Sequence, residues 1–326
     1  MRLVRRGLAP ALALLAGWAL AGPARAADPY PTRPVRIIVP FGAGGPADVY
    51  ARAVGQQLAL ALKQPFVIDN RPGAGAVVGT VEAARAAPDG YTLLMMSNTH
   101  TVNETLVPRK NYELMRDFVP VAPVNASDLV LVVHPSVKAT TLAELVALAK
   151  ARPGELNYAS SGQGTPYNMA GELFKSMTGT DIVHVPYRGS GEARTAVVGG
   201  HVQLMIDAVT TMAPNVAAGQ VRALATSGQA RSAILPDVPT VVEAGVPGYD
   251  ATIWLGFMAP KDTPREIVDR LAAAIAAAVD SPELKEAWAK QGAAPMRMTP
   301  AAFGDYLRAD IGKWAKVIKD ANLKPD

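Results

Sequence analysis

A glycine-rich stretch carries the clearest chemical signal in this sequence of 326 residues. It runs from Pro40 to Asp48, follows the apolar run Val35–Val39 and precedes a helical pattern. Glycine lets backbone N–H groups approach a ligand closely, and the partial positive charge at a helix N-terminus favours an anion. The sequence therefore predicts an anion site. The residues expected to contact the anion are Phe41, Gly42, Ala43, Gly44 and Gly45.

The same glycines also fit a dinucleotide-binding fingerprint. Residues 42–47 match the pattern G-x-G-x-x-A, and Asp69 follows 27 residues after Gly42, where a ribose-binding acid would lie. Asp69, however, opens the turn Asp69–Gly75, in which Asx side chains commonly bond the local backbone. Nicotinamide cofactors are also scarce outside the cytoplasm, and the chain begins with an export signal. We therefore favour a simple anion site and expect no cofactor.

A second strand–loop–helix unit resembles the first. The run Asn157–Ala159 leads into the loop Ser160–Pro166, where a threonine suited to cap a helix precedes a proline suited to its first turn. Alone, this loop fits a well-capped turn as well as a ligand contact. Two such units, one in each of two lobes, favour a ligand held between them. The contacts expected from this loop are Ser161, Gly162 and Thr165.

Three further segments place polar groups near the ends of predicted strands. Ser97 and Thr99 lie in a predicted polar turn, and their neutral donors suit orienting a ligand. Gly189 lies beside Arg188, which could pair with a carboxylate or face solvent. Asp207 could accept a hydrogen bond from a ligand hydroxyl, an ammonium group or a water, or could cap the helix that follows it.

Catalytic and metal-binding patterns are largely absent from the sequence. The chain has no cysteine, which excludes disulfides, thiol nucleophiles and cysteine–metal sites. Its four histidines show no metal-ligand spacing, and no G-x-S-x-G elbow occurs, so we expect no metal and no enzyme. The rival hypothesis is a secreted hydrolase that uses Ser160 or Ser161 with a distant histidine, which requires a histidine within hydrogen-bond reach of the hydroxyl.

Short apolar runs alternate with helical patterns, which predicts an α/β fold of two lobes, each a mixed sheet flanked by helices. The predicted strands are Val35–Val39, Phe66–Ile68, Thr92–Met96, Leu129–Val133, Asn157–Ala159, Ile182–Val185, Val202–Ile206, Val221–Thr226 and Ile253–Ala259. The predicted helices are Asp48–Leu62, Ala76–Ala86, Thr141–Ala151, Pro166–Thr178, Glu192–Val198, Pro264–Val279, Pro282–Gln291 and Pro300–Ala321.

Two extended stretches, Asp128–His134 and Ala251–Pro260, could each lead the chain from one lobe to the other. Two crossings make one lobe discontinuous and the other an insertion. We expect lobe 1 to comprise residues 27–127 and 254–326, and lobe 2 to comprise residues 128–253.

The first 26 residues have the pattern of a secretory signal peptide. Arginines precede the apolar stretch Leu8–Ala21, and Ala24–Ala26 provides a small-x-small cleavage site, which predicts cleavage after Ala26 and a periplasmic location. Removing the four arginines of this segment leaves 28 basic against 28 acidic residues, so the mature chain is neutral. This balance gives no electrostatic reason to expect nucleic acid as a partner.

Motifs along the whole mature chain resemble the Bug family, the TctC-like extracytoplasmic solute receptors of tripartite tricarboxylate transporters. The matching stretches are Tyr30–Phe41, Gly44–Asp48, Asp69–Gly75, Ala87–Leu94, Arg116–Phe118, Leu156–Ser160, Gly171–Phe174, His184–Gly189 and Leu235–Thr240.

The resemblance implies a monomeric periplasmic binding protein of the Venus-flytrap type that closes on a small organic anion, a mono- or dicarboxylate. Backbone N–H groups and bound waters hold the carboxylate in that family. The expected partners are membrane permease subunits or, alternatively, a sensor kinase. The sequence departs from the family at Ala208–Thr211, where members commonly have Asn followed by Leu-Pro-Ser. The sequence therefore leaves open what the far end of the ligand is, and with it the identity of the ligand.

Overall fold

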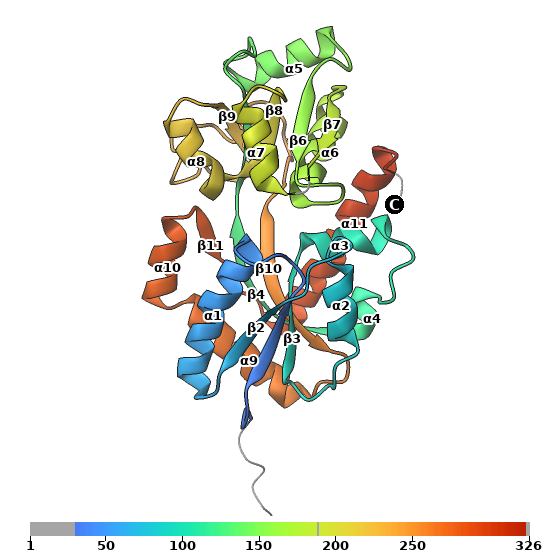
Figure 1. Ribbon diagram of the computed structural model, residues 1–326, viewed down its shortest axis with the longest axis vertical. Helices are drawn as coiled ribbons and strands as arrows, with labels where there is room; N and C mark the ends of the chain where they lie inside the picture. Colours follow the sequence, from blue (N-terminus) through green and yellow to red (C-terminus); the bar gives the residue numbers. More distant parts are fainter. Residues whose placement is uncertain (1–29, 188, 324–326) are drawn as a thin grey trace, which may run out of the picture.

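The computed structural model describes residues 30–187 and 189–323 and contains two β-sheets, one above the other in Figure 1. The predicted signal peptide and Arg188 lie outside the described residues. Each sheet is mixed and flanked by helices, as predicted from the alternating sequence pattern.

The first sheet has the strand order β11-β4-β10-β3-β1-β2. Strand β1 pairs in parallel with β2 and β3, whereas β10 runs antiparallel to β3 and β4. The side chains of β1 alternate between the two faces of the sheet. Val35, Ile37 and Val39 belong to the core on one face, and Ile38 belongs to the core on the other. The strands of this sheet are β1 (Val35–Val39), β2 (Phe66–Asn70), β3 (Thr92–Ser97), β4 (Phe118–Ser127), β10 (Ile253–Pro260) and β11 (Ala293–Pro295).

The second sheet has the order β7-β6-β8-β5-β9. Its strand β5 alternates in the same way, because Leu129, Leu131 and Val133 enter one core while Val130 and Val132 enter another. Both sheets are therefore buried on two faces, which explains their continuous apolar runs. The strands of this sheet are β5 (Leu129–Val133), β6 (Asn157–Ser160), β7 (Val183–Pro186), β8 (Leu204–Ala208) and β9 (Arg222–Thr226).

Helices cover both faces of each sheet (Figure 1). The helices around the first sheet are α1 (Pro46–Leu62), α2 (Val77–Ala84), α3 (Asn98–Leu106), α4 (Leu114–Asp117), α9 (Arg265–Val279), α10 (Pro282–Ala289) and α11 (Pro300–Asp320). Those around the second sheet are α5 (Leu142–Ala151), α6 (Pro166–Thr178), α7 (Ser190–Val198) and α8 (Val209–Ala217).

The chain passes between the sheets twice, once where β4 ends at Ser127 and β5 begins at Leu129, and again just before Ile253. These strand memberships support the division into lobes, and we propose residues 27–127 with 254–326 as lobe 1 and residues 128–253 as lobe 2. An apolar cluster also joins α11 and α3 to α6, with Trp314 and Met169 among its members.

Several elements differ from the prediction. Strand β4 went unpredicted because Pro120 and Pro123 argue against a strand, but its pairing with β10 shifts register beside both prolines, and bulges accommodate them. Helix α8 contains Pro214 and begins with β-branched residues, so its helical signal is weak. Helices α3 and α4 and the short strand β11 were also not predicted.

Within the part of the chain that the structure describes, no helix is both long enough and apolar enough to span a bilayer.

Candidate functional site

A cavity of about 500 Å³ opens between the two lobes. Lobe 1 contributes the loop from Phe41 to Ala47 together with Ser97 and Thr99, and lobe 2 contributes segments near Thr165 and Gly189. None of the described residues that line the cavity has a charged side chain. The lining residues are Phe41, Gly42, Ala43, Gly44, Gly45, Pro46, Ala47, Ser97, Thr99, Ser161, Thr165, Pro166, Tyr167, Gly189, Ser190, Gly191, Ile253 and Leu255.

Four helices begin at this cavity. The residues that precede the first turns of α1, α3, α6 and α7 are Gly45, Ser97, Thr165 and Gly189, and all four line it. The first N–H groups of a helix lack partners inside the helix and carry partial positive charge. The cavity therefore has a positive potential that comes from backbone dipoles instead of side-chain charge.

The four helix starts fall into two kinds. At α3 and α6, the side chains of Ser97 and Thr165 accept hydrogen bonds from the backbone N–H groups of Thr99 and Asn168. At α1 and α7, which follow Gly45 and Gly189, no side chain caps the helix. The uncapped helices belong to different lobes, so each lobe offers backbone donors that a bound anion could satisfy.

The segment Ser97–Thr101 is the end of β3 and the start of α3, and the prediction of a polar turn there was wrong. Ser97 and His100 form a capping box in which Ser97 N–H donates to His100 Nδ1 at 3.1 Å. Histidine replaces the usual Glu or Gln of this motif, so the helix signature was not visible in the sequence. Ser97 and Thr99 both line the cavity.

Two of the residues expected to contact the ligand do not line the cavity. Gly162 shapes the loop before α6, with φ at +119° and its N–H donated to Ser160 Oγ at 3.1 Å. Asp207 is fully buried in β8, where its carboxylate accepts hydrogen bonds from Arg194 Nε at 2.9 Å and from Thr211 Oγ1 at 3.3 Å. Burial raises the pKa of Asp207, although Arg194 opposes the rise. Asp207 thus joins β8 to α7 behind the cavity.

The hydrolase hypothesis requires a histidine within hydrogen-bond reach of a serine hydroxyl, and Ser160 satisfies this condition. Ser160 Oγ lies 2.6 Å from His184 Nε2, and burial lowers the pKa of His184, so the imidazole is neutral at pH 7. Ser160, however, has no exposed surface, and its hydroxyl also accepts the N–H of Gly162. A substrate cannot reach this hydroxyl, and His184 stacks on Tyr158 with ring centroids 4.9 Å apart, which fits a structural role.

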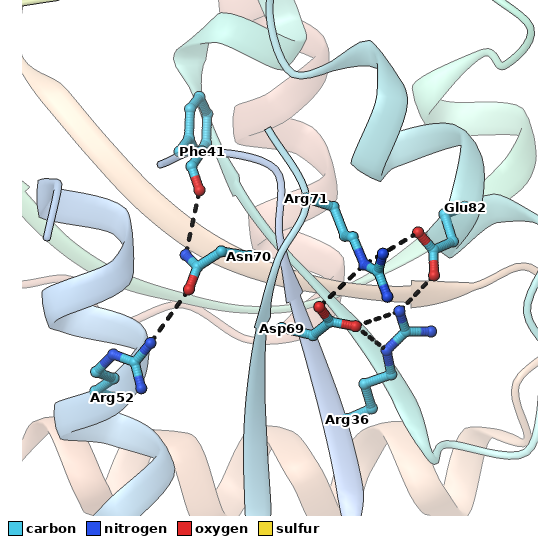
Figure 2. Close-up of polar contacts among 7 residues, drawn as sticks. All are labelled: Arg36, Phe41, Arg52, Asp69, Asn70, Arg71 and Glu82. Carbon is cyan, nitrogen blue, oxygen red and sulfur yellow. Dashed lines mark hydrogen bonds and ion pairs between the residues drawn. The ribbon is translucent and has the colours of Figure 1, made fainter. Parts of the chain in front are cut away.

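Asp69, the acid of the rejected dinucleotide fingerprint, belongs to an ion-pair network on the outer part of the first sheet (Figure 2). It accepts hydrogen bonds from Arg36 Nε at 2.7 Å and pairs with Arg71 Nε at 3.0 Å, and both arginines also pair with Glu82. The Asp69 carboxylate is therefore already paired with two arginine side chains. The sheet also continues from β3 into antiparallel β10, unlike a parallel dinucleotide fold.

Several lining residues were not predicted. Tyr167 directly follows the predicted loop Ser160–Pro166, and Ser190 and Gly191 directly follow Gly189, so a wider window around each helix start would have included them. Ile253 and Leu255 alternate along β10 and form an apolar wall. The prediction that this strand crosses between the lobes could have indicated that its side chains lie at the cleft.

Comparison with known proteins gives a consistent assignment. The family model described as tripartite tricarboxylate transporter family receptor matches residues 50–323. The chain is 40% identical over 300 residues to the protein BugT of Bordetella pertussis, covering 91% of this chain and 92% of BugT.

Solved structures agree with this match. The Rhodopseudomonas palustris protein Rpa4515, determined with adipate, has a TM-score of 0.83 and 36% identity, covering 91% of this chain and 100% of that one. MatC from Rhodopseudomonas palustris, determined with bound malate, has a TM-score of 0.79 and 32% identity, covering 89% of this chain and 100% of that one. The chain therefore belongs to the tripartite tricarboxylate transporter family of receptors, which bind solutes and are not enzymes.

Proposed function

We propose that this receptor captures a small organic carboxylate in the cavity between its lobes and delivers it to membrane permease subunits. The observation that carries this proposal is the meeting of two uncapped helix N-termini, at Gly45 and Gly189, in a cavity whose described lining has no charged side chain. Each lobe supplies backbone donors, and closure of the lobes would bring both sets onto one anion.

The known ligands of similar proteins support this choice. Rpa4515 was determined with adipate and MatC with malate, and both ligands are carboxylates. We infer that the contacts to the carboxylate come from the loop Phe41–Gly45, from Ser97 and Thr99, and from Ser161, Thr165 and Gly189. The apolar wall of Ile253 and Leu255 would contact the carbon skeleton.

Receptors of this family are periplasmic. We propose that residues 1–26 direct the chain to the periplasm and are removed after Ala26, because their sequence has the order of a cleavable signal.

Calorimetric titration of the mature protein tests the proposal. The protein is first unfolded and refolded to remove any ligand carried through purification, and then titrated with acetate, succinate, adipate, malate, citrate, benzoate and terephthalate. At least one carboxylate should bind and should stabilise the fold by about 2.7 kcal/mol at a hundredfold excess over Kd. A matched series of neutral amides should not bind. A protein that binds none of these acids would contradict the proposal.

A further inference from the structure

One acidic side chain lies directly behind the loop proposed to hold the carboxylate. Asp48 belongs to the first turn of α1, is 3% exposed, and follows Gly44–Ala47, which line the cavity. Its Oδ2 accepts the Gly44 N–H at 2.9 Å. A carboxylate at this place stabilises the loop. Unless its charge were balanced, however, it would reduce the positive potential of the helix N-terminus and repel an anion in the cavity.

Arg52, one helical turn further along α1, provides that balance. Its Nη2 lies 2.9 Å from Asp48 Oδ1, and its Nε donates to Asp48 Oδ2 at 3.1 Å. The guanidinium thus donates a hydrogen bond to Oδ2 and forms an ion pair with Oδ1, whereas a lysine offers a single charged atom.

The same guanidinium reaches the other end of the loop. Arg52 Nη2 also donates to Asn70 Oδ1 at 3.2 Å, and Asn70 Nδ2 donates to the carbonyl oxygen of Phe41 at 3.2 Å (Figure 2). The loop is therefore fixed at two points, at Gly44 through Asp48 and at Phe41 through Asn70. Arg52 is common to both connections.

No other charged group replaces Arg52 among the described residues around Asp48. On β2 the neighbour is the neutral amide of Asn70, and the adjacent Asp69 is paired with Arg36 and Arg71 elsewhere (Figure 2). Burial by itself raises the pKa of Asp48, but hydrogen bonds from Arg52 and from the Gly44 N–H outweigh burial and leave the pKa below its usual range. Asp48 is therefore ionised at neutral pH while Arg52 is in place.

We propose that Arg52 is a positioning residue of the carboxylate site, which neutralises Asp48 and holds Phe41 through Asn70 so that the loop presents its N–H groups to an anion without repulsion. The inference rests on the proposed function, because it assigns how one half of that site is held and balanced. Arg52 itself does not line the cavity, and its role is exerted through Asp48 and Asn70.

The test is a set of charge variants titrated with the acid of the panel above that binds the wild type most tightly. Arg52→Met should weaken binding about ten- to a hundredfold at pH 8, because the negative charge of the buried Asp48 is then no longer neutralised and repels the ligand. The double variant Asp48→Asn with Arg52→Met should return to within about threefold of the wild type, since the asparagine oxygen can still accept the Gly44 N–H. Arg52→Lys should be weakened less than Arg52→Met, because it keeps the charge but loses the two-atom contact with Asp48 and the link to Asn70.

The matched control is Arg265→Met, which removes the arginine of another i,i+4 pair, with Asp269 on α9, away from the cavity. It should bind as the wild type does. The pH profile adds a readout that a loss of folding would not give. Between about pH 8.5 and pH 6.5 the ligand stays ionised, and the weakening in Arg52→Met should not grow as the pH falls, because loss of the cation favours the neutral form of Asp48.

Three results would overturn the inference. They are wild-type affinity in Arg52→Met, a double variant as weak as Arg52→Met, and a weakening that grows as the pH falls. Absence of binding by the wild type to every acid of the panel would instead reject the proposed function, so the two failures are distinguishable.

Discussion

Replacing His100 by glutamine should remove a specific part of the acid sensitivity of this protein. His100 is fully buried beneath the cavity wall, where its Nδ1 accepts the Ser97 N–H and its Nε2 lies 3.0 Å from Thr80 Oγ1. The Thr80 hydroxyl donates to the carbonyl oxygen of Ala76, so it must accept from Nε2–H. This arrangement suits a neutral imidazole, which burial also favours. Protonation would place a second hydrogen on Nδ1, which would displace the Ser97 N–H and leave Nδ1–H only the Ser97 carbonyl oxygen at 3.2 Å.

Burial lowers the pKa of His100 from 6.5 to about 4. Between these values the unfolded chain binds a proton that the folded protein does not, so the free energy of unfolding falls as the pH falls. Each pKa unit corresponds to about 1.4 kcal/mol, and the shift therefore costs about 3 kcal/mol by pH 4 and nothing above about pH 7.

The assay is urea unfolding of the ligand-free wild type and of His100→Gln at a series of pH values from about 4 to about 7.5. Glutamine is a usual residue at this position of a capping box and can accept the Ser97 N–H, so the helix start is retained. Other groups titrate equally in both proteins, so the difference in unfolding free energy isolates His100. It should shift by about 3 kcal/mol in favour of the variant as the pH falls. A difference that stays constant across the pH range would refute the reasoning.

Three further substitutions probe the loop, the buried ion pair and the packing. Gly44→Asp should weaken carboxylate binding about a hundredfold or more through like charge at the loop, and unchanged affinity in calorimetry would remove this loop from the site. Arg194→Met leaves Asp207 buried without its cation and should lower the unfolding free energy by about 3–5 kcal/mol; a loss under about 1 kcal/mol in urea unfolding would contradict the pairing. Gly171→Ala should destabilise by about 1–3 kcal/mol, because its Cβ would lie 2.5 Å from the Tyr158 ring. Thermal melts check this against the control Gly312→Ala, which has nothing within 4 Å of the added Cβ and should be neutral or stabilising.

Local signals in the sequence were sufficient for elements whose ends are marked by specific residues. Helix α6 has the predicted bounds Pro166–Thr178, because Thr165 caps it, a proline opens it and Gly179 ends it with φ at +64°. The glycine loop before α1 was predicted to meet a ligand cavity from its position between a strand and a helix, and its residues do line the cavity.

Features that depend on distant contacts were not predictable in this way. Prolines in β4 argue against a strand until the bulges opposite β10 are known. The burial of Asp207 depends on Arg194, which lies on a different element, α7. Likewise, Ser160 and His184 are separated by 24 residues in the sequence, and only the pairing of β6 with β7 brings their side chains together. A partner across a sheet leaves no periodic signal along one chain.

A crystal structure of the mature protein with the tightest-binding acid of the panel tests the central claim most directly. We expect the carboxylate between the lobes, with its oxygens within hydrogen-bond distance of backbone N–H groups in the first turns of both α1 and α7. A ligand that lies outside this cavity, or that is held by one lobe alone, would contradict the account.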